Sequence, residues 1–149
     1  MKFETLNEVI ISLILWISTH TIHPKPQNEI IVEFIEQKKL QQLACKKPCE
    51  IMAYTPASQT KKIYLINDLK PLTDVCHQAI LMHEIIHIIQ EENSYASEFD
   101  EKTKKHLREM NALVNHNIFL SQYGKKILYS NGFAAKFKTD KKSTNNLYC

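Results

Sequence analysis

The feature that most constrains this fold is an apolar helical segment that carries three polar side chains. Residues 79–89 contain no glycine or proline, and their only polar members are His83, Glu84 and His87. A helix that is apolar nearly all round belongs inside a domain, because it has no broad face to offer to water. Burying two histidines and a glutamate is costly unless a partner satisfies them. The sequence therefore predicts a buried helix whose polar groups share such a partner.

The spacing of these three residues, H-E-x-x-H, is typical of a metal site. His83 and His87 lie four residues apart and so share one helix face, where both imidazoles can bind a single zinc ion. Glu84 lies about 100° round the helix from His83, within reach of a water at that ion. Two nitrogen ligands beside a carboxylate base indicate metal-assisted hydrolysis. The alternative is a chance match on a surface helix, and the apolar surroundings disfavour it.

A hydrolytic zinc site keeps three protein ligands and leaves a fourth position open. One common pattern adds a histidine six residues after the second ligand, with a glycine between them. Gln90 and Asn93 stand at those two positions, which excludes this pattern. The other common source is a glutamate on a second helix. The candidate glutamates are Glu91, Glu92, Glu98, Glu101 and Glu109.

Among these candidates, position in the predicted helices favours Glu109. Glu91 shares a helix face with the two histidines, but three such ligands span about 12 Å along a straight helix and cannot converge. Glu98 and Glu101 fall at a helix start, where the helix dipole already favours negative charge. Glu109 falls in mid-helix, and Ala112 nearby permits a close approach of two helices. We therefore predict Glu109 as the third ligand.

The order of predicted elements indicates an α+β domain. Helical spacing of apolar residues predicts an N-terminal helix over 6–18, and alternation predicts a strand over 30–34. A short helix is predicted over 38–43, followed by a hairpin of strands 51–55 and 62–66. The H-E-x-x-H helix comes next, with Thr73 as its N-cap. A long helix then runs from Ser97 or Asp100 to Gly124. A chain of 149 residues is expected to form one such domain, 1–149.

The formal net charge of +3 is concentrated at the C-terminal end. Residues 123–149 hold six lysines and one aspartate, and we expect a mobile, solvated basic tail after about residue 130. We do not expect a nucleic-acid partner. The apolar run 9–17 is too short to cross a bilayer as a helix, so no membrane span is expected.

Four cysteines constrain the redox environment. Cys45, Cys49, Cys76 and Cys149 permit three pairings, of which a local bridge between Cys45 and Cys49 is sterically feasible. An even number of cysteines slightly favours an exported or periplasmic protein over a cytoplasmic one.

The H-E-I-I-H run is followed after 21 residues by Glu109-Met110-Asn111-Ala112, and this pair of motifs resembles the gluzincin pattern, HExxH then ExxA. The chain more closely resembles small single-domain bacterial gluzincin-like proteins of uncharacterised function. The residues that carry this closer resemblance are Trp16, Cys45, Cys49, Gln90 and Ala112. The resemblance implies a minimal zincin-like domain and a zinc metallopeptidase acting on a peptide or protein. It implies His83, His87 and Glu109 as zinc ligands and Glu84 as general base.

Several interpretations remain open at this point. We expect no second domain that would build a deep cleft, so a zincin-fold metal-binding interaction module (toxin-like or regulatory) with weak or no catalysis is the alternative function. His116 is either a hydrogen-bond donor to a reaction intermediate or a partly exposed helix histidine. Tyr95 and Tyr123 are either oxyanion donors or residues at the rim of the core. The strand over 62–66 is a candidate sheet edge for an extended peptide.

Overall fold

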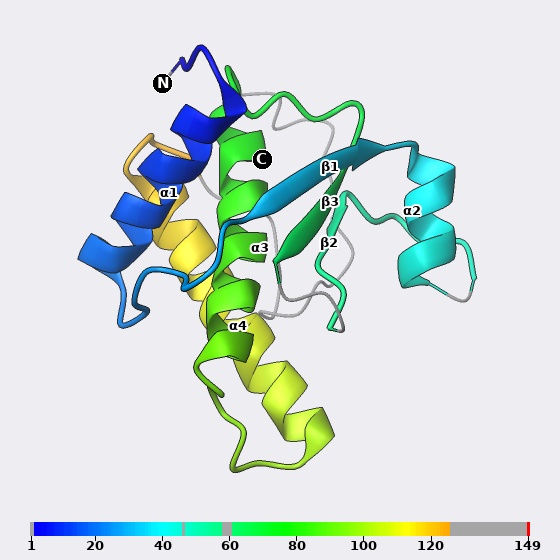
Figure 1. Ribbon diagram of the computed structural model, residues 1–149, viewed down its shortest axis with the longest axis vertical. Coiled ribbons are helices and arrows are strands. Elements are labelled where there is room, and N and C mark those ends of the chain that lie inside the picture. The colour runs from blue at the N-terminus through cyan, green and yellow to red at the C-terminus, as the bar shows by residue number, and fades with distance from the viewer. Residues whose placement is uncertain (1, 46, 58–60, 126–148) are drawn as a thin grey trace.

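Helix α3 (Val75–Glu92), which carries the H-E-x-x-H motif, runs through the middle of the fold (Figure 1). The structure is a computed structural model and describes residues 2–45, 47–57, 61–125 and 149. Helix α3 contacts α1 (Leu6–His20), α4 (Glu101–Ser121) and two strands of the sheet. In Figure 1 the sheet and α1 lie on opposite sides of α3. The domain is therefore built around the helix that the sequence predicts to be buried.

The sheet has three strands in the order β1-β3-β2 among the described residues. Strand β1 (Ile31–Ile35) pairs in parallel with β3 (Lys62–Ile66), and helix α2 (Gln37–Ala44) lies between β1 and β3 in the chain. Strand β2 (Ala53–Tyr54) pairs antiparallel with β3, so the predicted hairpin is present. The α+β class is confirmed, because the described residues form four helices and a small mixed sheet.

Two predictions about the sheet are wrong. The first hairpin strand is only Ala53–Tyr54, not 51–55. Strand β3 is the central strand of the sheet and not an edge, because β1 pairs with one side of it and β2 with the other. The parallel β1–β3 pair joins residues about thirty positions apart, and local alternation carries no signal for it. The edges of the sheet are therefore β1 and β2.

The sequence of α3 explains why it is buried. Seven of its apolar side chains are at most 1% exposed: Ala79, Leu81, Met82, Ile85, Ile86, Ile88 and Ile89. Asp74 is the N-cap, and its carboxylate accepts hydrogen bonds from the backbone N–H groups of Cys76 and His77. The predicted cap, Thr73, lies one residue too early. The helix ends at Glu92, with Asn93 as C-cap.

Helix α4 starts at Glu101, and Asp100 is its N-cap, whose side chain accepts from the backbone N–H of Thr103. A start at Ser97, the earlier of the two predicted positions, is therefore wrong. The helix ends at Ser121, and Gly124 follows in the left-handed conformation expected of it, with φ +69°. Helical spacing predicts that Ala112, Leu113, Ile118 and Leu120 face the core. The first two and Leu120 are buried, but Ile118 is 42% exposed and that part of the prediction is wrong. The other helices are close to their predicted bounds, α1 being two residues longer than expected.

Two disulfides join the four cysteines. Cys45 bonds to Cys49, which is the local bridge that the sequence permits, and Cys76 bonds to Cys149. The second bridge ties the last residue of the chain to the first turn of α3. The predicted mobile tail falls in residues 126–148, which lie outside the described residues. No helix in the described part of the chain is both long and apolar enough to cross a membrane.

The N-cap assignment gives a first prediction. Asp74→Ala should lower the free energy of unfolding by about 1 kcal/mol, because two N–H groups at the start of α3 lose their acceptor. Thr73→Ala, one residue earlier, should change it by less than about 0.5 kcal/mol. Urea unfolding followed by circular dichroism measures both. An equal effect of the two substitutions would contradict the assignment.

Candidate metal centre

Three side chains from two helices meet at one point. His83 and His87 project from α3, and Glu109 projects from the middle of α4, which packs against α3. The Nε2 atom of His83 lies 3.0 Å from Glu109 Oε1, and the Nε2 atom of His87 lies 3.1 Å from Glu109 Oε2. One donor atom from each residue lies within 4.8 Å of the other two. His83, His87 and Glu109 form a group that could hold a metal ion, and their role as ligands stays a prediction.

The donor set fits a small divalent ion. Ligands that surround zinc at about 2.0–2.2 Å in a tetrahedron stand roughly 3.3–3.6 Å apart. The two nitrogen–oxygen separations, 3.0 and 3.1 Å, come within a few tenths of an ångström of that range. Both imidazoles turn Nε2 towards the carboxylate, so all three donors face a common point. Ala112, three residues after Glu109, is fully buried, and its small side chain permits the close approach of α4.

The electrostatics of the group reflect its burial and its mutual contacts. Burial alone would raise the pKa of the Glu109 carboxyl, but hydrogen bonds from His83 and His87 outweigh burial and hold that pKa well below its usual range. Burial lowers the pKa of His87, but its hydrogen bond to Glu109 and the negative charges of Glu84 and Glu109 outweigh it and raise that pKa. Metal binding would replace these hydrogen bonds, because an imidazole binds a metal ion only through an unprotonated nitrogen.

Each histidine of the group also has a partner for its second ring nitrogen. His87 Nδ1 lies 2.9 Å from the side-chain oxygen of Gln90, one turn further along α3. His83 Nδ1 lies 3.2 Å from Nδ1 of His116, which comes from α4. His116 is only 4% exposed, so its interpretation as a partly exposed helix histidine is wrong. Both rings are thus held at the nitrogen that faces away from Glu109.

Glu84, the predicted general base, is tied to the sheet side of the fold. The hydroxyl of Thr55 donates a 2.7 Å hydrogen bond to Glu84 Oε2. Thr55 directly follows β2, so the hairpin contacts α3 at this residue. The sequence offers no partner for Glu84 at helical spacing, and the partner found lies 29 residues away.

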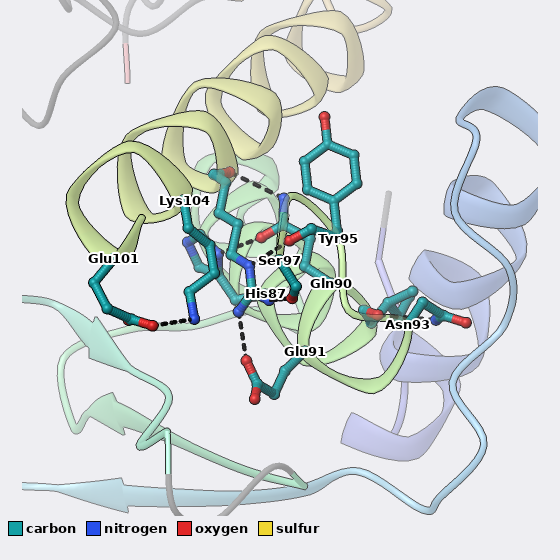
Figure 2. A network of polar contacts seen from close by, with 10 residues as sticks. His87, Gln90, Glu91, Asn93, Tyr95, Ser97, Glu101 and Lys104 are labelled. Carbon is teal, nitrogen blue, oxygen red and sulfur yellow. Dashed lines mark hydrogen bonds and ion pairs between the residues drawn. The ribbon is translucent and has the colours of Figure 1, made fainter. Parts of the chain in front are cut away.

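The other candidates from the sequence lie elsewhere. Glu91 pairs with Arg108, and Glu101 pairs with Lys104 in the first turn of α4 (Figure 2). Glu98 is exposed. Of the two candidate oxyanion donors, Tyr95 packs edge-on against the ring of His23.

Tyr123, the second candidate oxyanion donor, lies at the far end of α4. It lines a surface hollow beside Asp74 and Val75, at the N-terminal end of α3. His83 lies two turns further along α3, so the structure does not bring Tyr123 to the group.

Four residues make contacts around the group that the sequence did not predict, although His116 was already a candidate for a different role. They are Thr55, His116, Asn111 and His23. Each belongs to another element or to a loop, and only the packing of α1, α4 and the hairpin on α3 brings it near. Comparison of the chain with protein-family models, with curated proteins and with solved structures found no match.

The burial of His116 gives a prediction about pH. Burial, with a smaller contribution from positive charge on His83, lowers the pKa of His116 to about 3, so this imidazole is neutral in the folded protein. The unfolded chain takes up a proton near pH 6.5. Stability is therefore lost as pH falls from about 6.5 towards 3. In metal-free protein, His116→Gln should show a smaller loss of unfolding free energy between pH 7 and pH 4 than the wild type. Parallel curves for the two proteins would contradict the buried, neutral state.

Proposed function

We propose that this chain is a zinc-dependent metallopeptidase of the gluzincin type, with a minimal zincin-like domain. The observation that carries the proposal is the convergence of His83 Nε2, His87 Nε2 and the Glu109 carboxylate, with Glu84 next in sequence to His83. Two imidazoles and one carboxylate are the ligand set of many catalytic zinc sites. Nitrogen donors favour zinc over magnesium or calcium, which prefer oxygen.

The proposed mechanism assigns one role to each residue. His83, His87 and Glu109 would hold the zinc ion, which supplies a Lewis acid for the scissile carbonyl and lowers the pKa of water. Glu84 accepts the proton of the attacking water and later donates it to the leaving amine. The hydrogen bond from Thr55 fixes the orientation of the Glu84 carboxylate through Oε2. This hydrogen bond therefore keeps the Glu84 carboxylate in position during the proposed proton transfer.

The substrate we propose is an extended peptide or a protein segment. Strand β2 is an edge of the sheet and contacts α3, and Thr55 after it reaches Glu84. A peptide that adds to this edge by backbone hydrogen bonds would pass close to the base. The edge at β2 thus replaces β3 as the proposed site of peptide alignment.

The same group of side chains also fits a second function. A metal-binding interaction module that keeps the same ligands without turnover would need no substrate cleft. The two proposals share the zinc site and differ in whether Glu84 acts as a base.

The two disulfides support a proposal about location. Disulfides persist in oxidising compartments and are rare in the cytosol. Cys45–Cys49 and Cys76–Cys149 use all four cysteines. We therefore propose that the protein works in an exported or periplasmic setting.

The ligand assignment predicts a specific pattern of zinc loss. His83→Ala, His87→Ala and Glu109→Gln should each weaken zinc binding by more than about tenfold, because each removes one donor. Glu98→Gln is the matched control, since Glu98 is an exposed glutamate just before α4. Titration calorimetry with metal-free protein measures the affinities. Wild-type affinity in Glu109→Gln would remove Glu109 from the ligand set.

A substitution of Glu84 tests peptide hydrolysis separately from zinc binding. Glu84→Gln keeps the shape of the side chain and its acceptor for Thr55, but removes the base. We expect unchanged zinc affinity and a loss of peptide hydrolysis on the order of 10² or more. A peptide-library digest analysed by mass spectrometry gives the substrate for this comparison. Equal cleavage by both proteins would refute the mechanism, and zinc binding without any cleavage would favour the interaction module.

A further inference from the structure

Gln90 is a fully buried polar residue that touches both helices of the proposed metal site. It lies in the last turn of α3 and is 0% exposed. Its side-chain nitrogen donates to the backbone carbonyl of Arg108 at 2.9 Å and to Oδ1 of Asn111 at 3.0 Å, both on α4. Its side-chain oxygen lies 2.9 Å from His87 Nδ1. Figure 2 shows Gln90 and His87 within this network.

The chemistry of these contacts fixes the direction of every hydrogen bond. A backbone carbonyl only accepts, so the NH₂ group of Gln90 must face Arg108, and the amide oxygen must face His87. An amide oxygen also only accepts, so His87 Nδ1 must carry a proton and donate it. A neutral His87 then has its lone pair on Nε2, the nitrogen that lies 3.1 Å from Glu109. One backbone carbonyl thus determines which nitrogen of His87 can bind a metal.

The same side chain also sets the position of Glu109. The carbonyl of Arg108 belongs to the peptide bond that joins Arg108 to Glu109. Asn111, the second acceptor, lies two residues after Glu109. Gln90 therefore holds α4 on both sides of the third donor, and a slip of α4 along α3 would break these bonds.

The network continues to the segment between α1 and β1. His23 is 4% exposed, and its Nε2 lies 2.6 Å from Asn111 Oδ1, which already accepts from Gln90. An amide oxygen accepts only, so His23 donates here. The segment between α1 and β1, helix α3 and helix α4 are thus joined through the side-chain amides of Gln90 and Asn111.

We propose that Gln90 is the positioning residue of the metal centre. It holds His87 with Nε2 free for the ion, and it fixes the register of α4 that brings Glu109 to His83 and His87. The inference rests on the proposed zinc site and concerns how that site is pre-organised. Outer hydrogen-bond partners of metal ligands are commonly worth 10–100-fold in metal affinity.

The test compares three variants of the whole chain. Gln90→Met keeps the length of the side chain and removes all of its hydrogen bonds. Gln90→Glu keeps an acceptor for His87 Nδ1 but loses the amide donors to α4. Gln78→Met is the matched control, because Gln78 is a glutamine on the same helix that is 1% exposed and lies five residues before His83, more than one turn away from it. Zinc affinity by calorimetry and unfolding free energy of metal-free protein by urea are measured for each.

We expect Gln90→Met to bind zinc about 10–100-fold more weakly than the wild type, and Gln78→Met to lose stability without losing affinity. Gln90→Glu should bind zinc more tightly than Gln90→Met although it is less stable, because its carboxylate still accepts from His87. If Gln90 had only a packing role, Gln90→Met would exceed Gln90→Glu both in zinc affinity and in unfolding free energy. That order, or wild-type affinity in Gln90→Met, would overturn the inference.

The outcomes also separate this inference from the proposed function. Zinc binding by the wild type with no effect at Gln90 removes only the positioning role. A wild type that binds no zinc removes the metal centre and the positioning role together. If Gln90→Met does not fold, the comparison of Gln90→Glu with Gln78→Met carries the test, and equal zinc affinities in those two would overturn the inference.

Discussion

The Glu109 carboxylate faces the imidazoles of His83 and His87 across the contact between α3 and α4, and the rest of the fold depends on this cluster. Helix α3 is buried by its isoleucine, leucine and methionine side chains, so its polar groups have little access to water. A buried polar group without a partner costs free energy of folding. Glu109 supplies the partner for both histidines at once. The same contacts that remove this cost bring together three side chains that could hold a metal ion.

The side chains that hold His83 and His87 lie on one side of α3, and the side chain that holds Glu84 lies on the other. On the side of α4, His116 and Gln90 hold the nitrogens of His83 and His87 that face away from Glu109. On the side of the sheet, Thr55 holds Glu84. Metal affinity should therefore depend mainly on how α4 packs, and catalysis on how the hairpin packs. The two can be perturbed separately, which is why a metal-binding module and a peptidase can share this architecture.

Patterns within one helix were predictable from the sequence, because spacing of 3.6 residues determines which side chains share a face. The pairing of His83 with His87, the burial of α3 and the choice of Glu109 in mid-helix all follow from such local patterns. Contacts between elements were not predictable in the same way. Thr55 and His116 lie 29 and 33 residues from Glu84 and His83, their partners in the group. His116 was a candidate from the sequence, but its contact with His83 could not be inferred from local spacing. Strand β3 was misplaced at an edge for the same reason, since its parallel partner β1 comes from before α2.

The most direct test of the account is the position of the ion in the protein. Anomalous diffraction at the zinc absorption edge, from crystals grown with zinc, would locate the metal without assumptions about the ligands. The account predicts one peak enclosed by His83 Nε2, His87 Nε2 and the Glu109 carboxylate, at about 2.0–2.2 Å from each. A peak bound to other side chains, or one that involves His116 in place of Glu109, would contradict it.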